Sequence, residues 1–219
     1  MRICVEAVMS AWNMTPSKGG SGGAVKAPAG NHLAVLVGIF DMGHQEDDFD
    51  PNKVRWQHRA YFVWELVGEP IAGTNKNHVI GIDLTLSLNE KAKLRKWIEA
   101  RTGKPIPDGV PFDPTSELGQ ACFLNVIEKN GYPKVDGVAA VPKGIPVPKS
   151  SYAPVAVTLS EFKAGTAIPD WCPWLYGNEL AEHIKASREL GGAKPRPKKA
   201  GAVAPAGDAT DNSDDPIPF

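Results

Sequence analysis

The chain has 219 residues, 42% of them hydrophobic, and its formal net charge is −1 at pH 7. This length and composition predict one main domain with a substantial core, and no apolar run approaches the roughly 20 residues that cross a bilayer. The nearly neutral charge excludes nucleic-acid binding through the field of the whole molecule, so any such binding needs a local basic patch. We expect a cytoplasmic protein with no membrane partner.

The first segment, residues 1–30, is rich in glycine, as in Gly19-Gly20-Ser21-Gly22-Gly23, and is expected to be a flexible arm. The apolar and β-branched run of residues 33–40 then predicts a buried strand, and residues 41–51 predict a polar loop. The folded body should therefore begin near residue 31.

A long amphipathic strand is predicted over residues 54–66, because apolar and polar side chains alternate along it. The alternation assigns Phe62 and Trp64 to the core. On the opposite face, the same alternation predicts an exposed polar surface that contains Arg55, Arg59 and Tyr61, and also Gln57 and Glu65.

A third alternating strand is predicted over residues 80–87, and the apolar period then changes to that of a helix over residues 88–102. Ser87-Leu88-Asn89-Glu90 has the spacing of a capping box, and Gly103 with Pro105 predicts the end of the helix.

Two more strands are predicted at residues 121–127 and 132–141, joined by Asn130-Gly131, a strong hairpin signal. Three strands, one helix and two strands are the element order of an OB-fold, a partly open five-stranded Greek-key barrel that binds oligonucleotides. The predicted fold is therefore mainly β and OB-like, although other small β folds share this order.

The rest of the body is predicted to extend this barrel. The Pro-rich residues 142–158 should wrap around it without forming a second domain, and a C-terminal helix should follow, with Asn178 as its cap and Leu180 and Ile184 on its apolar side. Residues 31–190 thus form the predicted OB domain with its extension, and residues 191–219 form a disordered linker and tail.

The last six residues, Asp214-Asp215-Pro216-Ile217-Pro218-Phe219, resemble the C-terminal tip of bacterial-type single-stranded DNA-binding proteins. In that family, consecutive aspartates precede Ile-Pro-Phe after a Gly/Pro-rich linker. The whole chain looks like the phage or prophage-encoded branch, although Pro216 stands where a third aspartate is common. A tail that only aids solubility has no reason to end in an exposed aromatic ring.

The resemblance implies a protein that binds and protects single-stranded DNA, without sequence preference, in replication, recombination or repair. It also implies that the tip recruits partner proteins of these processes. The ring and terminal carboxylate of Phe219 suit an apolar pocket with a basic rim, and Asp214 and Asp215 suit further cations. A homo-oligomer is compatible with the sequence.

Binding of single strands requires aromatic platforms for bases and cations for phosphates. The polar face of the second strand offers both, with Trp56 expected to turn towards solvent at a strand end or bulge. Loop cations and later aromatics extend the candidate DNA contacts, which are Lys53, Arg55, Trp56, Arg59, Tyr61, Lys76, Phe123, Tyr132, Lys134 and Lys143.

Motifs for metals, cofactors or catalysis do not stand out. Cys4, Cys122 and Cys172 lack CxxC spacing, and the acidic loop of residues 41–50 has no second carboxylate group with the spacing to complete a cation site. We therefore expect no metal, no cofactor and no enzyme. Two alternatives remain: an accessory nucleic-acid enzyme, and an OB-type protein-interaction module, which the mildly acidic body would suit.

Overall fold

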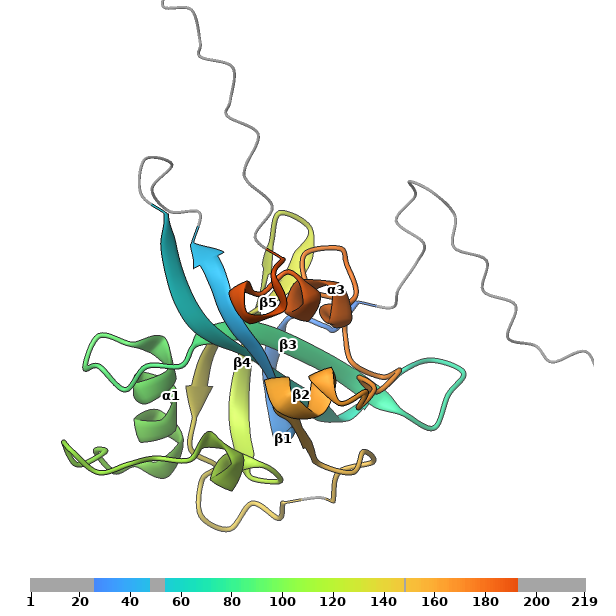
Figure 1. Ribbon diagram of the computed structural model, residues 1–219. Helices are drawn as coiled ribbons and strands as arrows, with labels where there is room; N and C mark the ends of the chain where they lie inside the picture. The colour runs from blue at the N-terminus through green and yellow to red at the C-terminus, as the bar shows by residue number, and fades with distance from the viewer. Residues whose placement is uncertain (1–25, 48–53, 148, 193–219) are drawn as a thin grey trace, which may run out of the picture.

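The computed structural model of the protein describes residues 26–47, 54–147 and 149–192. One long strand, β1 (Gly30–Asp47), organises the fold because both of its edges are paired. It runs antiparallel to β2 (Arg55–Pro70) along one edge and to β4 (Ala121–Lys129) along the other (Figure 1). The remaining strands are β3 (Asn77–Thr85), β5 (Tyr132–Ala139) and β6 (Val155–Val157).

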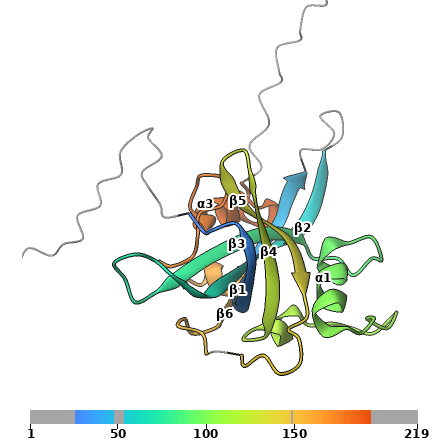
Figure 2. The ribbon, with the colours of Figure 1, turned by 180° about the vertical axis from the view of Figure 1, so that it is seen from behind.

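The strands form one sheet with the path β3-β2-β1-β4-β5, and all pairings on this path are antiparallel (Figure 2). The short β6 pairs with β1 in parallel. Strands β3 and β5, at the two ends of the path, approach one another, but no pairing between them is present in the described part of the chain. The protein is therefore mainly β, with a curved sheet that does not close.

Strand β1 is longer than its apolar run predicts. Its pairing with β2 continues through Asp47, so that residues 41–47, expected in a loop, are strand. The register shifts between Leu36 and Gly38 and between Asp41 and Gly43, which marks two bulges. Bulges bend and twist a strand without ending it, and the cross-strand hydrogen bonds outweigh the polar composition of this segment.

One face of the sheet packs against helix α1 (Lys93–Thr102), forming what we call the inner core. Phe62 and Trp64 of β2 stack with ring centroids 6.2 Å apart, and Trp64 meets Trp97 of the helix edge-on at 5.9 Å. The prediction that Phe62 and Trp64 belong to the core is confirmed.

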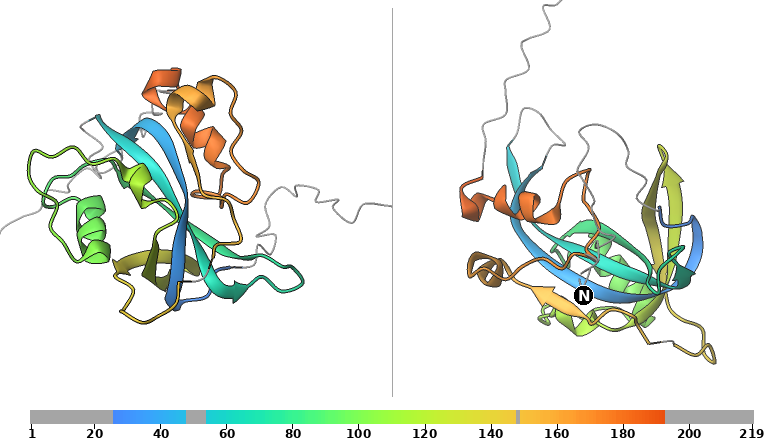
Figure 3. Two further views of the ribbon diagram at one scale, coloured as in Figure 1. Left: turned by 90° about the horizontal axis from the view of Figure 1, so that it is seen from below. Right: turned by 90° about the vertical axis from the view of Figure 1, so that its right-hand side faces the viewer.

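The opposite face is covered by residues 150–192, here called the C-terminal extension (Figure 3). Its elements after β6 are α2 (Leu159–Lys163), α3 (Leu180–Lys185) and the 3-10 turn η2 (Arg188–Leu190). Extension and sheet share an outer core, so the extension is not a separate domain, as predicted. The fully packed members of this outer core are Val35, Val37, Phe40, Met42, Tyr61, Val63, Tyr152, Val157, Leu175, Leu180 and Ile184.

Helix α1 is shorter than predicted. It begins at Lys93 instead of residue 88, and Ala92 at its N-cap makes no side-chain hydrogen bond. The Ser87 hydroxyl accepts from the Asn89 backbone N–H at 3.3 Å, so this segment forms a turn that competes with the predicted capping box. The predicted end is confirmed, because Gly103 adopts a left-handed conformation and its N–H donates to Glu99 O.

Smaller predictions at the turns have mixed outcomes. Asn130 and Gly131 both have positive φ, which confirms the tight β4–β5 hairpin turn. Helix α3 buries Leu180 and Ile184 as predicted, but its cap is Glu179 rather than Asn178. The described end of the expected flexible arm, residues 26–30, packs on the body, with Ala27 in the inner core.

None of the helices in the described ranges has the length and apolar composition that a membrane span requires. Cys122 is buried and Cys172 is half-buried, and both are free thiols. Burial raises the pKa of each thiol to about 12, which keeps both protonated and unreactive near neutral pH.

Candidate nucleic-acid interface

The polar face predicted for β2 is only partly exposed. Arg55 lies in solvent at the start of the strand, whereas Tyr61 is 1% exposed and sits in the outer core. The expectation that Tyr61 is a surface contact is wrong, because the C-terminal extension covers this part of the strand. The ring packs so closely on Gly81 of β3 that a Cβ there would lie 2.4 Å from the Tyr61 hydroxyl.

Arg59, two residues before Tyr61, is half-buried at the edge of the covered area. Its guanidinium forms an ion pair with Asp83 of β3 at 2.5 Å, and its Nε is buried without a hydrogen-bond partner among the described residues. Arg59 is thus fixed in position by Asp83 and retains donor capacity.

Trp56 lies at the hairpin end of β2 and is half-buried, so it is not fully turned to solvent as predicted. The guanidinium of Arg188 in η2 lies 5.9 Å from its ring centroid, within the range of a cation–π contact. Lys53, the candidate at the start of this face, lies outside the described residues.

The β4–β5 hairpin gathers a second group of predicted contacts on its outer face. Tyr132 is 64% exposed, and the ammonium of Lys26 lies 5.1 Å from its ring centroid while donating to Gly131 O. Lys134 is exposed, and its pairing with Ile127 places it on the face that also carries half-buried Phe123. Aromatic and basic side chains therefore share one strand surface.

Charged side chains also lie between this hairpin and Arg59, where β3 and β5 approach one another. The pKa of Lys93, at the start of α1, is lowered mainly by burial and to a smaller extent by the nearby Lys134. Asp136 and Asp83 act in the opposite direction and raise it. Helix α1 contacts both β3 and β5, and β3 contacts β5, so the charges of these three elements form one neighbourhood. Arg59 and Lys134, from distant parts of the sequence, flank this neighbourhood.

Two predicted lysine contacts lie elsewhere. Lys76 is exposed in the β2–β3 loop and Lys143 is exposed in the loop after β5. Figure 1 shows that these loops project from different sides of the body, away from the β4–β5 turn. The structure does not gather either lysine with the Arg59 and Lys134 region.

Two exposed aromatic residues escaped the sequence-based selection. Trp174 is 65% exposed and Tyr176 is 73% exposed, in the segment that precedes α3. The Tyr176 hydroxyl donates to Asp83 at 2.8 Å, so this segment reaches the same carboxylate as Arg59. Gly177 was the available sequence signal, because glycine favours the positive φ of a tight turn.

The acidic loop does not assemble a metal site in its described part. Asp41 pairs with His58 at 2.7 Å and Glu189 pairs with His44, while the two imidazole rings stack with centroids 5.0 Å apart. No group of three or more potential ligands is found among the residues that the structure describes. His58 therefore links β2 to β1, and His44 links β1 to η2.

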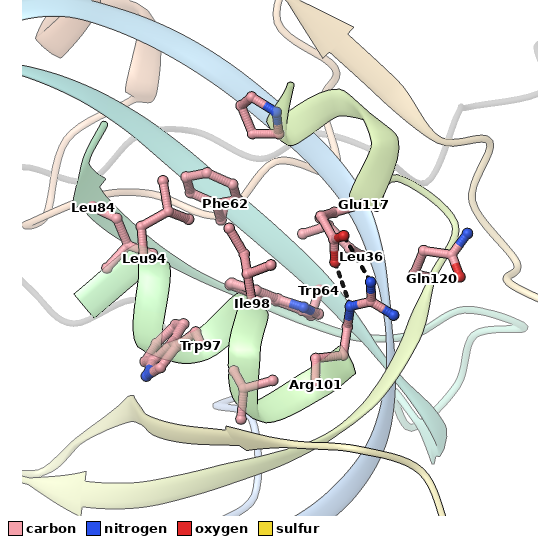
Figure 4. Close-up of a pocket in the computed structure, with 12 residues that line it drawn as sticks. Leu36, Phe62, Trp64, Leu84, Leu94, Trp97, Ile98, Arg101, Glu117 and Gln120 are labelled. Atoms are coloured by element: carbon pink, nitrogen blue, oxygen red, sulfur yellow. Dashed lines mark hydrogen bonds and ion pairs between the residues drawn. The ribbon is translucent and has the colours of Figure 1, made fainter. Parts of the chain in front are cut away.

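A cavity between α1 and the sheet has a volume of only about 30 Å³ (Figure 4). Apolar side chains such as Leu36, Phe62 and Trp97 line it, and the Arg101–Glu117 ion pair lies at one side. This space suits a water molecule, not an organic ligand. The space between α1 and the sheet is therefore not a candidate site for an organic ligand.

No family model, no curated protein and no solved structure matches this chain.

Proposed function

We propose that this protein binds single-stranded DNA without sequence preference and recruits replication, recombination or repair proteins through the tip Asp214–Phe219. The observation that carries this proposal is the sequence of the tip, which lies outside the described residues. Aspartates followed by Ile217, Pro218 and Phe219 combine charge with a hydrophobic anchor, and the two prolines limit the entropy lost on binding, so this chemistry suits docking into a small basic pocket.

The described body supports the proposal through its topology. A helix between the third and fourth strands, and the path β3-β2-β1-β4-β5 with its ends close together, are compatible with an OB barrel left open between β3 and β5. We propose that the body is an OB-fold whose outer face has been partly covered by the C-terminal extension.

The surface chemistry supports it as well. Tyr132 and Lys134 occupy one face of the β4–β5 hairpin. Arg59 and Lys93 lie near the place where β3 approaches β5. This arrangement supplies rings for bases and cations for phosphates despite the net charge of −1. The local patch takes the place of an overall positive field.

We expect the full chain to bind labelled oligo-dT more tightly than duplex DNA of equal length in a fluorescence anisotropy titration, because stacking requires unpaired bases. Affinity should fall as salt rises, since phosphate contacts release counterions. Lys134→Ala should reduce the salt slope by about 0.7, whereas Lys104→Ala, in the exposed loop after α1, should leave it unchanged.

One observation favours a second candidate, a protein-interaction module. Asp83 and Asp136 lie among the cations of the proposed surface, and Arg59 is already paired with Asp83. Acidic residues weaken phosphate binding, whereas on a surface that contacts a protein they can pair with a complementary positive patch of the partner. Absence of oligo-dT binding at low salt would reject the DNA proposal and leave this candidate.

A further inference from the structure

Residues 174–178 form a tight turn that presents two aromatic side chains. Leu175 N–H donates to Asn178 O at 2.9 Å and Asn178 N–H donates to Leu175 O at 3.0 Å. The two central residues, Tyr176 and Gly177, have φ values of 49° and 81°. Positive φ at both central positions is the pattern of a type I′ turn, in which asparagine and glycine are favoured and tyrosine is unfavourable.

Several contacts hold Tyr176 in this unfavourable conformation. Leu175 is buried in the outer core, and His183 Nε2 donates to Leu175 O at 2.8 Å. The Tyr176 ring meets the His183 ring edge-on with centroids 6.0 Å apart, and its hydroxyl donates to Asp83. Backbone strain maintained by surrounding contacts is a feature of functional positions.

The contacts fix the ring of Tyr176 while leaving it open to solvent. Its hydroxyl and one edge are held, yet the residue is 73% exposed, and Trp174 two positions earlier is 65% exposed. A ring held in one orientation loses little entropy when a flat partner stacks on it. The turn is therefore preorganised for stacking.

The charges beside this turn indicate what stacks there. Asp83 joins Tyr176 to Arg59 by a hydrogen bond and an ion pair, and Lys93 lies at the start of α1, which contacts the strand β3 that carries Asp83. Exposed rings beside cations suit a single strand of nucleic acid, because the rings can stack on its bases and the cations can contact its phosphates.

We propose that Trp174 and Tyr176 are the main base-stacking residues of the single-stranded DNA site. The C-terminal extension then buries Tyr61 of β2 and supplies exposed rings of its own, one of which is hydrogen-bonded to Asp83 of β3. This inference rests on the proposed function and names the residues that act as its stacking platform.

The test compares the full chain with the double variant Trp174→Ala/Tyr176→Gly, in which glycine preserves the left-handed turn. Oligo-dT affinity should fall by roughly 5- to 150-fold, the equivalent of one stacked base or more. The control Val110→Ala removes an exposed apolar side chain outside this turn and should not change the affinity. Thermal melts should show that both variants remain folded.

Trp174→Phe provides a second measurement that does not depend on the stability of the double variant. Base stacking quenches indole fluorescence, and this variant removes Trp174 while keeping the other five tryptophans, so oligo-dT should quench the wild type more than this variant. Equal quenching in both proteins would overturn the inference.

The outcomes separate this inference from the function on which it rests. Wild-type binding with an unchanged double variant, within twofold, rejects the stacking role and leaves DNA binding intact. Loss of a captured partner protein at unchanged DNA affinity would reassign the turn to protein docking. A wild type that binds no DNA at low salt rejects the proposed function and this inference together.

Discussion

Glu65 shows how a single side chain ties the C-terminal extension to the sheet. It is 0% exposed in β2, and its carboxylate accepts hydrogen bonds from Asn77 Nδ2 at 2.7 Å, from Ser151 N–H at 2.9 Å and from the Ser150 hydroxyl. Burial raises the pKa of Glu65, but these hydrogen bonds together outweigh burial and lower it. The folded protein therefore favours the ionised carboxylate.

Glu65→Gln should destabilise the protein by about 1–3 kcal/mol at pH 7, because the NH₂ group of the glutamine amide would face other hydrogen-bond donors in a buried site. Urea unfolding measures this loss, and exposed Glu128→Gln is the control. Since the folded pKa is lowered, the stabilisation is complete above the unfolded pKa of about 4.5 and is lost as pH falls through the folded value. The difference between wild type and variant should shrink in acid; equal stabilities at pH 7 would contradict this account.

At the scale of the elements, η2 docks against β1 at a position that requires glycine. Gly43 has a φ of +66°, and a Cβ there would lie 2.7 Å from Glu189 Oε2 and 3.0 Å from Ser187 Cβ. Glu189 also accepts from the His44 backbone N–H at 2.9 Å. The end of the extension is therefore held where β1 bulges and its backbone is accessible.

Gly43→Ala should cost more stability than Gly68→Ala. Both positions have positive φ, so both variants carry backbone strain of about 1–2 kcal/mol. Only Gly43 has close neighbours, since nothing lies within 4 Å of a Cβ at Gly68. Crowding should add about 1–3 kcal/mol to the Gly43 variant. Urea unfolding of the two variants measures the difference, and equal losses would show that η2 does not depend on close approach.

The molecule as a whole assigns its two proposed activities to different parts of the chain. The described body carries rings and cations on a curved sheet, and the acidic tip follows a Gly/Pro-rich segment with a basic block at Lys194, Arg196, Lys198 and Lys199. Binding of DNA and binding of proteins should therefore respond to different substitutions.

Phe219→Ala should abolish capture of DNA-processing proteins from a host lysate, because the anchoring ring is lost. Binding of oligo-dT should persist or tighten modestly, since a tethered acidic peptide competes with phosphates at high effective concentration. Ser213→Ala, just before the tip, is the matched control. A Phe219 variant that keeps its protein partners but loses DNA would reverse the assignment of tip and body.

Local signals in the sequence determined much of the element order. Asn130-Gly131 specifies a hairpin because both residues tolerate positive φ, and Gly103 ends α1 for the same reason. The alternation along β2 identified Phe62 and Trp64 as core residues. These features depend on neighbours within a few positions, so they are readable without tertiary structure. The tip is a sequence feature in the same sense.

Only the tertiary structure decided which surfaces remain open. Alternation shows that Arg59, Tyr61 and Glu65 share a face, but burial of that face depends on a segment some 90 residues later in the chain. Exposure of Trp174 and Tyr176 likewise results from the docking of Leu175 and α3. Local pattern determines how a side chain points along its strand, whereas contacts between distant segments determine whether it meets solvent, and the candidate site depends on the second.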